Sequence, residues 1–273
     1  MPKNEFFELQ ETTGLRRFLL HAGPDVCVGP PNWRFMFGGV GLAAAVAAME
    51  RVSGRQLICA TARFLAPAPL GASVQFDVDT LAEGRHIGQA LVRATVEDQM
   101  MLLVTGSLGG RPSEIGVQWA AMPRVPSPHE CPVFEHWRGS KEGVHARFEH
   151  RLANQGSEGG DGSTERGESR LLLWSRSRER LSSDAALMAI LADHAHMAIG
   201  HALGRMAGGP SLDNTLRIHS RATTEWVLGE FSALSVDGGI AHVTVRLFSS
   251  EGQLLASASQ SFVLRIRQSA SER

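Results

Sequence analysis

Acidic and imidazole side chains gather in one short stretch of the second half of the chain, which contains Asp193, His194, His196 and His201. Such side chains can ligate metals, but helical zinc sites place two histidines four residues apart on one face. On a helix, His194 and His196 point in nearly opposite directions, so their spacing does not favour a metal site and we expect no bound metal. Asp193 then has two interpretations: it faces a ligand, or it accepts a hydrogen bond from a backbone amide or an arginine.

A glycine-rich stretch in the first half, Gly38-Gly39-Val40-Gly41, is the second feature that could do chemistry. It lacks the Lys-Ser/Thr ending of a phosphate-binding P-loop and the spacing of a dinucleotide fingerprint. A helix N-terminus has free backbone donors for a carbonyl oxygen, and Gly39 allows close approach to them. We expect Gly38 and Gly39 to contact a substrate, and we expect no cofactor.

Each half contains one long helix that positions these residues. Residues from Val40 to Met49 are apolar on every side and end near Gly54. In a water-soluble protein such a helix must be surrounded by other elements. A second helix is expected from a cap among residues 182–184 to about Gly204, because Gly208-Gly209-Pro210 prevents its continuation. One strongly curved sheet around each helix would bury both.

An internal repeat supports this architecture. When the sequence is shifted by 154 positions, residues 61–109 lie over residues 215–263 without a gap. The apolar alternation of the two copies and their turn signals also coincide, which predicts antiparallel strands joined by short hairpins. The identical pairs are Thr61/Thr215, Arg63/Arg217, Ala68/Ala222, Gly84/Gly238, Glu97/Glu251, Gln99/Gln253 and Ser107/Ser261.

Composition excludes several classes of protein. The 273 residues include 27 Lys and Arg against 28 Asp and Glu, and this balance argues against a nucleic-acid-binding protein. No apolar stretch approaches the roughly 20 residues of a membrane helix. Three cysteines, Cys27, Cys59 and Cys131, fit reduced thiols better than a disulfide framework. We therefore expect a cytoplasmic protein without a membrane span.

Several motifs carry a resemblance to a known family. They are Phe37-Gly38-Gly39-Val40, Ala62-Arg63-Phe64-Leu65-Ala66-Pro67, Ser211-Leu212-Asp213-Asn214-Thr215, Glu225-Trp226-Val227-Leu228, and the run from Glu251 to Gln260. Together they resemble the type II acyl-CoA thioesterases, the TesB-like proteins. The resemblance covers nearly the whole chain. It implies an α+β double-hotdog fold in which two antiparallel sheets each wrap a central helix.

The resemblance also implies the site residues. In the family an Asp, a Thr or Ser and a Gln hold the water that attacks the thioester, and here Asp213 and Gln260 match the Asp and the Gln. Leu234 falls where the hydroxyl is expected, so Ser235 could supply it only through a bulge that turns it inward. Asp213 could instead be a turn or cap residue, and Gln260 a solvent-facing polar residue. Asp193, on the second helix, is expected to face the substrate.

These observations predict a hotdog domain at residues 1–112, a linker at 113–140 and a second hotdog domain at 141–273. The expected function is hydrolysis of an acyl-CoA to a free acid and CoA by a water held by Asp213 and Gln260. The alternative is a non-catalytic acyl-thioester or lipid-binding protein, which the Leu at the hydroxyl position favours. The resemblance implies a homo-oligomer. A glycine-rich loop at residues 156–163 is expected to be cut first by proteases.

Overall fold

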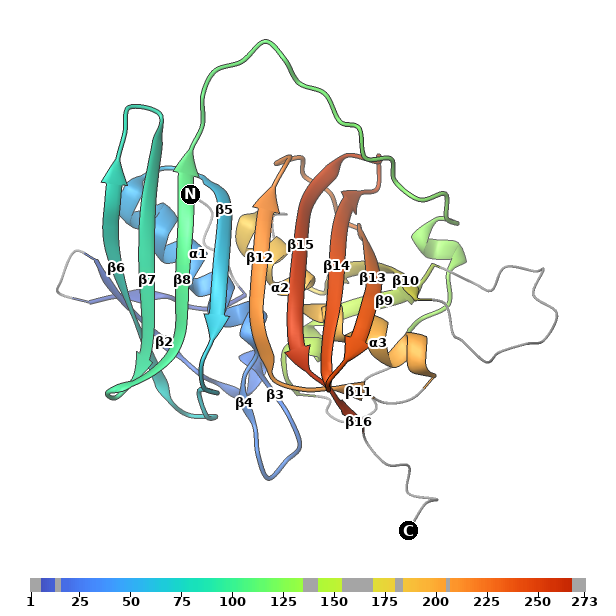
Figure 1. Cartoon of the computed structure of the whole chain (residues 1–273), viewed down its shortest axis with the longest axis horizontal. Helices are drawn as coiled ribbons and strands as arrows, with labels where there is room; N and C mark the ends of the chain where they lie inside the picture. Colours follow the sequence, from blue (N-terminus) through green and yellow to red (C-terminus); the bar gives the residue numbers. More distant parts are fainter. Residues whose placement is uncertain are drawn as a thin grey trace.

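The computed structural model describes residues 6–12, 16–134, 142–153, 169–179, 184–204 and 207–266. The expected protease-sensitive loop at residues 156–163 lies outside these ranges. Within them, twelve strands form one antiparallel sheet in the order β1-β2-β6-β7-β8-β5-β12-β15-β14-β13-β10-β9, with the long helices behind it in Figure 1. The molecule is thus an α+β chain in which a single wide sheet covers one side of the helices.

The strands of the first half are β1 (Gln10–Glu11), β2 (Arg17–His21), β5 (Leu57–Phe64), β6 (Ser73–Glu83), β7 (Ile87–Val96) and β8 (Gln99–Gly109). Those of the second half are β9 (Phe148–Leu152), β10 (Arg170–Ser177), β12 (Ser211–Ile218), β13 (Val227–Asp237), β14 (Ile240–Ser249) and β15 (Leu254–Val263). Two small ribbons pair β3 (Cys27–Val28) with β4 (Phe35–Met36) and β11 (Ala207–Gly208) with β16 (Arg265–Ile266).

The two expected sheets are joined into one, which corrects the prediction of a separate sheet for each helix. Strand β5 of the first half pairs antiparallel with β12 of the second, and Thr61 lies directly opposite Thr215. These two threonines are also counterparts in the sequence repeat. The joint therefore lies on the pseudo-twofold axis that relates the halves, and the hydrogen bonding of the sheet continues across it.

The first helix forms as the sequence predicts, and the second is interrupted. Helix α1 (Gly38–Ser53) ends at Gly54, whose φ of 64° is the left-handed conformation that glycine adopts easily. Asp184 caps α2 (Ala185–Ala192), and its side chain accepts a hydrogen bond from the Leu187 amide. A 3₁₀ turn, η4 (Asp193–Ala195), then separates α2 from α3 (His196–Leu203). None of the described helices is long and apolar enough to cross a membrane.

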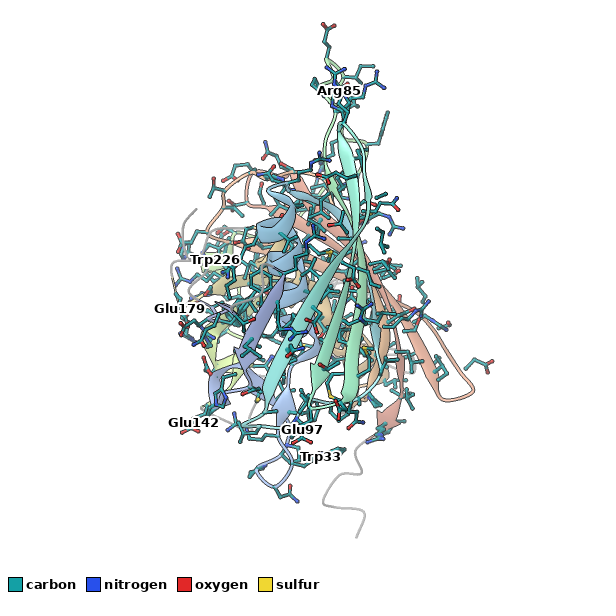
Figure 2. All side chains as sticks on the ribbon, turned by 90° about the vertical axis from the view of Figure 1, so that its left-hand side faces the viewer. Trp33, Arg85, Glu97, Glu142, Glu179 and Trp226 are labelled. Atoms are coloured by element: carbon teal, nitrogen blue, oxygen red, sulfur yellow. The ribbon has the colours of Figure 1, made fainter. Side chains whose placement is uncertain are left out.

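One continuous apolar core fills the space between the helices and the inner face of the sheet, the face that points toward them. Val40 and Leu42 of α1 are fully buried, as are Val74 and Phe76 of β6. Figure 2 shows α1 on one side of the strongly twisted strands, with Arg85 at the β6–β7 turn far from Glu97 at the β7–β8 turn. Because α1 also packs against α2, the two halves share this core.

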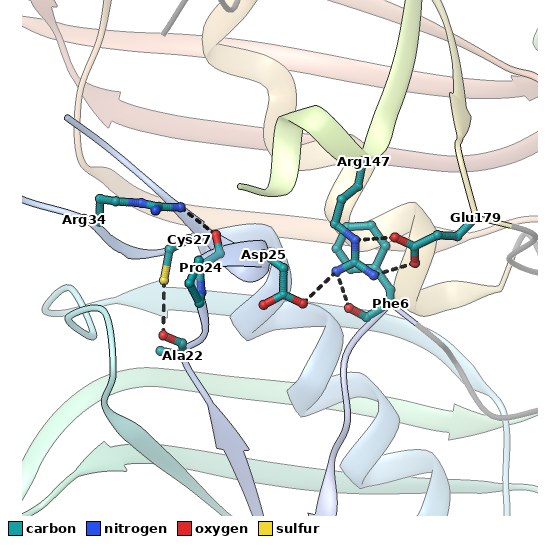
Figure 3. A network of polar contacts seen from close by, with 8 residues as sticks. All are labelled: Phe6, Ala22, Pro24, Asp25, Cys27, Arg34, Arg147 and Glu179. Atoms are coloured by element: carbon teal, nitrogen blue, oxygen red, sulfur yellow. Dashed lines mark hydrogen bonds and ion pairs between the residues drawn. The ribbon is translucent and has the colours of Figure 1, made fainter. Parts of the chain in front are cut away.

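A second connection between the halves lies at their periphery, near the short 3₁₀ turns η1 (Pro24–Val26) and η3 (Val144–Arg147). Another 3₁₀ turn, η2, spans Pro128–Glu130. The Arg147 guanidinium forms a bidentate ion pair with Glu179 of its own half. It also donates to the Phe6 carbonyl, contacts Asp25, and lies 3.7 Å above the centre of the Phe6 ring (Figure 3). Arg147 thereby ties the N-terminal segment to the second half.

Candidate active site

The carboxylate of Asp193 lies at the centre of a buried polar cluster, at the break between α2 and α3. Its Oδ2 accepts a hydrogen bond of 2.5 Å from the backbone amide of Gly39, near the start of α1. Its Oδ1 accepts a hydrogen bond from Nε2 of Gln260 on β15. Gly39 and Asp193 are 154 residues apart, which is the offset of the repeat. Equivalent positions of the two halves thus meet here, and a carboxylate of one half caps a helix of the other.

Glycine at positions 38 and 39 allows this approach. A Cβ atom on Gly39 would lie 2.8 Å from Cβ of Asp193 and 3.0 Å from the backbone Cα of Ile190 in α2. A Cβ atom on Gly38 would lie 2.9 Å from Oδ2 of Asp193 and 3.0 Å from the Phe64 ring. Both glycines that the sequence predicts as substrate contacts therefore lie against Asp193, where a side chain would separate α1 from the carboxylate.

A β-bulge brings Ser211 into the same cluster. Ser211 pairs with Phe262, and Asp213 pairs with Ser261, so Leu212 is the extra residue on β12. Because of this extra residue, Ser211 points to the inner face, where regular alternation would place Leu212. Nε2 of Gln260 donates to Oγ of Ser211 over 2.8 Å while it also donates to Asp193. Ser211 is a site residue that the sequence did not predict, although it stands two residues before Asp213 in the motif Ser211-Leu212-Asp213-Asn214-Thr215.

Two buried side chains near Asp193, Asn214 and Gln260, have polar atoms without a partner among the described residues. Asn214 and Gln260 lie directly opposite each other on β12 and β15, and both side chains point to the inner face. Within the described part of the chain, Oε1 of Gln260 and both polar atoms of the Asn214 side chain are buried and make no hydrogen bond. Such groups are rare in folded proteins and call for an explanation.

Burial raises the pKa of Asp193 from 3.8 to about 7, because the ionised form loses its hydration. The hydrogen bonds from Gln260 and Gly39, and the nearby amide of Asn214, act in the opposite direction and only partly offset the effect of burial. The carboxyl is therefore partly ionised near neutral pH, which is the range suited to a general base.

Two buried histidines beside the cluster, His194 and His150, do not supply a positive charge. Burial lowers the pKa of His194 far below its ordinary value and lowers the pKa of His150 to about 4, so both imidazoles are neutral at pH 7. Nε2 of His194 lies 3.2 Å from Nδ1 of His145, and Nδ1 of His194 lies 3.3 Å from the Leu191 carbonyl oxygen. Among the described residues, no group of three or more His, Cys, Asp or Glu side chains is arranged to hold a metal ion.

The structure places Asp213 and Ser235 on the other side of the sheet from Gln260. Asp213 forms an ion pair of 2.9 Å with the exposed Arg63 and accepts from the Ser261 amide. The predicted bulge in β13 does occur before Ser235. It does not turn Ser235 inward, because Ser235 lies in one row with His242, Ser261 and Asp213 across the outer face of the sheet. The structure therefore brings together Gly38, Gly39, Asp193 and Gln260, and does not bring Asp213 or Ser235 to them.

Comparison with known proteins identifies the family. The family model described as the acyl-CoA thioesterase C-terminal domain matches residues 125–264, and the corresponding N-terminal domain model matches residues 29–109. This chain belongs to the acyl-CoA thioesterase family. The predicted resemblance to TesB-like thioesterases is confirmed, and the protein is an acyl-CoA thioester hydrolase. Among curated protein sequences, none matches this thioesterase.

Solved structures agree with this assignment. A protein from Novosphingobium aromaticivorans, named as a provisional thioesterase, is 32% identical, with a TM-score of 0.85 over 94% of this chain and 98% of its own. The tesB protein of Mycobacterium avium subspecies paratuberculosis is 24% identical, with a TM-score of 0.75 over 97% of this chain and 98% of its own. The acyl-CoA thioesterase II TesB2 of Mycobacterium marinum is 19% identical, with a TM-score of 0.71 over the full length of both chains. A protein described as having a hot dog fold, from Alicyclobacillus acidocaldarius, is 20% identical, with a TM-score of 0.82 over 98% of both chains, and this likeness shows the fold.

Proposed function

We propose that this thioesterase hydrolyses its acyl-CoA substrate with a water molecule activated by Asp193 and oriented by Gln260 and Ser211. The observation that carries the proposal is the buried Asp193 carboxylate, whose pKa is raised to about 7 and which is bound to Gln260. A base with a pKa near the working pH can take a proton from water and release it again. Asp193 therefore replaces Asp213 as the proposed base.

The orientation of the amide of Gln260 supports this role. Its NH₂ group donates to Asp193 and Ser211, so its oxygen points away from both. That oxygen is buried and has no partner among the described residues, so it can accept a hydrogen bond from the attacking water. The hydroxyl of Ser211 accepts from Gln260, which leaves its own hydrogen to donate to the same water or to the substrate.

The proposed reaction has two steps. The water oxygen attacks the thioester carbonyl carbon while one water proton moves to Asp193, which gives a tetrahedral intermediate with a negative oxygen. The intermediate collapses, the carbon–sulfur bond breaks, and the CoA sulfur takes the proton from Asp193. The products are a free acid and CoA. No covalent enzyme intermediate is needed, because the oriented water is the nucleophile.

Access to the cluster is proposed through its partly exposed rim. Asp193, Asn214 and Gln260 are buried, whereas Gly38, Ser211 and Phe64 are only partly buried. The Phe64 ring lies against Gly38 beside the carboxylate, so the thioester would enter past this ring.

The alternative of a non-catalytic binding protein loses its main argument. It depended on Leu234 occupying the hydroxyl position. Leu234 is the extra residue of a bulge in β13, is 62% exposed, and lies two strands away from Gln260 in the sheet. The hydroxyl in the cluster belongs to Ser211.

The test measures release of free thiol from acyl-CoAs of graded chain length. Asp193→Asn keeps the size of the side chain but removes the proton acceptor, so kcat should fall by on the order of 10²- to 10⁴-fold. Asp213→Asn is the matched control on the outer face, and its kcat should stay within about threefold of the unmodified enzyme. Full activity of the Asp193 variant, or a large loss in the Asp213 variant, would contradict the assignment.

A further inference from the structure

Asn214 is a fully buried polar residue that the steps above do not use. It lies on β12 between Ala62 of β5 and Gln260 of β15, each directly opposite it in the sheet. Its neighbours on the strand, Asp213 and Thr215, face the outer side, so the side chain of Asn214 points toward the helices. Its relative exposure is 0%.

Nothing in the described part of the chain satisfies this side chain. Neither its oxygen nor its nitrogen makes a hydrogen bond there. Desolvation without a compensating bond destabilises the folded state, and an apolar residue of the same size would avoid the loss. The position is next to the proposed base, because Asn214 lies directly opposite Gln260, whose side-chain amide donates to Asp193. The missing partner is therefore expected to be a group that enters the cluster from outside the chain.

The chemistry of the cluster identifies that group. A thioester that undergoes attack needs a hydrogen-bond donor for its carbonyl oxygen, which gains negative charge. The Gly39 amide at the start of α1 already donates to Asp193, and Nε2 of Gln260 already donates to Asp193 and Ser211. The side-chain NH₂ of Asn214 has two hydrogens and bonds none of the described residues, so it is a buried donor that is free to bind this oxygen.

We propose that Asn214 is a catalytic residue whose side-chain NH₂ donates a hydrogen bond to the thioester carbonyl oxygen and stabilises the oxyanion formed when water attacks. The proposal rests on the proposed role of Asp193, which fixes where the water and the carbonyl carbon must be. The proton of the water still goes to Asp193 and then to the CoA sulfur. Asn214 transfers no proton and serves only as a donor to the oxygen.

The main test is Asn214→Leu, which keeps the size of the side chain and removes the donor. Thiol release should show a fall in kcat of on the order of 10²- to 10³-fold with a much smaller change in KM, as for loss of an oxyanion donor. The melting temperature should rise, because two unsatisfied buried atoms are removed. Thr215→Val is the matched control: it is the next residue on the strand, bonds Ser259 on the outer face, and should keep full turnover.

A binding experiment separates this role from that of Asp193. Two inert analogues of an acyl-CoA are compared: a ketone, in which CH₂ replaces the sulfur, and a thioether, which lacks the carbonyl. Asn214→Leu should weaken binding of the ketone about tenfold relative to the thioether, the effect of one hydrogen bond. The inference is overturned if this ratio is unchanged or if kcat stays within twofold. Should the Leu variant fail to fold, Asn214→Ala is judged by the same two criteria. A fully active Asp193→Asn variant would refute the role of Asp193 as the base. It would not change the effect of Asn214→Leu on binding of the ketone.

Discussion

The ionisation of one residue, Asp193, should set the pH dependence of the enzyme. Burial raises its pKa to about 7, and a general base works only when ionised. Thus kcat/KM should fall about tenfold per pH unit below pH 7 and level off above it.

Gln260 donates to the ionised form of Asp193 and lowers its pKa. Gln260→Leu should therefore move the acid limb of the rate profile to higher pH as well as reduce turnover. Rate profiles from pH 5 to 9 test both expectations, and a profile that is flat across this range would exclude Asp193 as the base.

At the scale of elements, the close contact of α1 with α2 holds Asp193 in place. Gly39→Ala puts a methyl group 3.0 Å from the Ile190 backbone, so the helices must separate. We expect a loss of roughly 1–3 kcal/mol in unfolding free energy, together with reduced turnover. Gly41→Ala is the control in the same helix, because its methyl group would meet only flexible side-chain ends of Leu102 and Met36. Denaturant unfolding measures both, and equal stabilities would show that the contact is not tight.

At the scale of the whole molecule, two arginines connect the halves, and their contributions to stability should differ. Arg147 has 13% of its side chain exposed, holds Glu179 with two bonds and stacks on Phe6, so Arg147→Ala should cost roughly 1–3 kcal/mol. Arg63, which pairs with Asp213 across the β5–β12 joint, is 59% exposed, and Arg63→Ala should cost under about 1 kcal/mol. Thermal unfolding of the two variants decides the order, and a larger loss for Arg63 would contradict it.

The sequence by itself determined the local structure and the repeat of the two halves. Alternating apolar residues such as Val74 and Phe76 mark a strand, and the uninterrupted apolar run from Val40 marks a buried helix, because these patterns repeat within a few residues along the chain. The match of Thr61 with Thr215 also indicates two similar halves. The hotdog fold itself came from the resemblance in the motifs.

Only the tertiary structure decided which polar side chains meet. The extra residue in β12 turns Ser211 rather than Leu212 inward, and a strand pattern of period two cannot reveal such a bulge. The joint between β5 and β12 merges the expected two sheets, since pairing between distant strands depends on the folded chain. The same packing brings Asp193 to Gly39 and raises its pKa through burial. The carboxylate proposed as the base is therefore defined by contacts between the halves and not by the motif in which Asp213 stands.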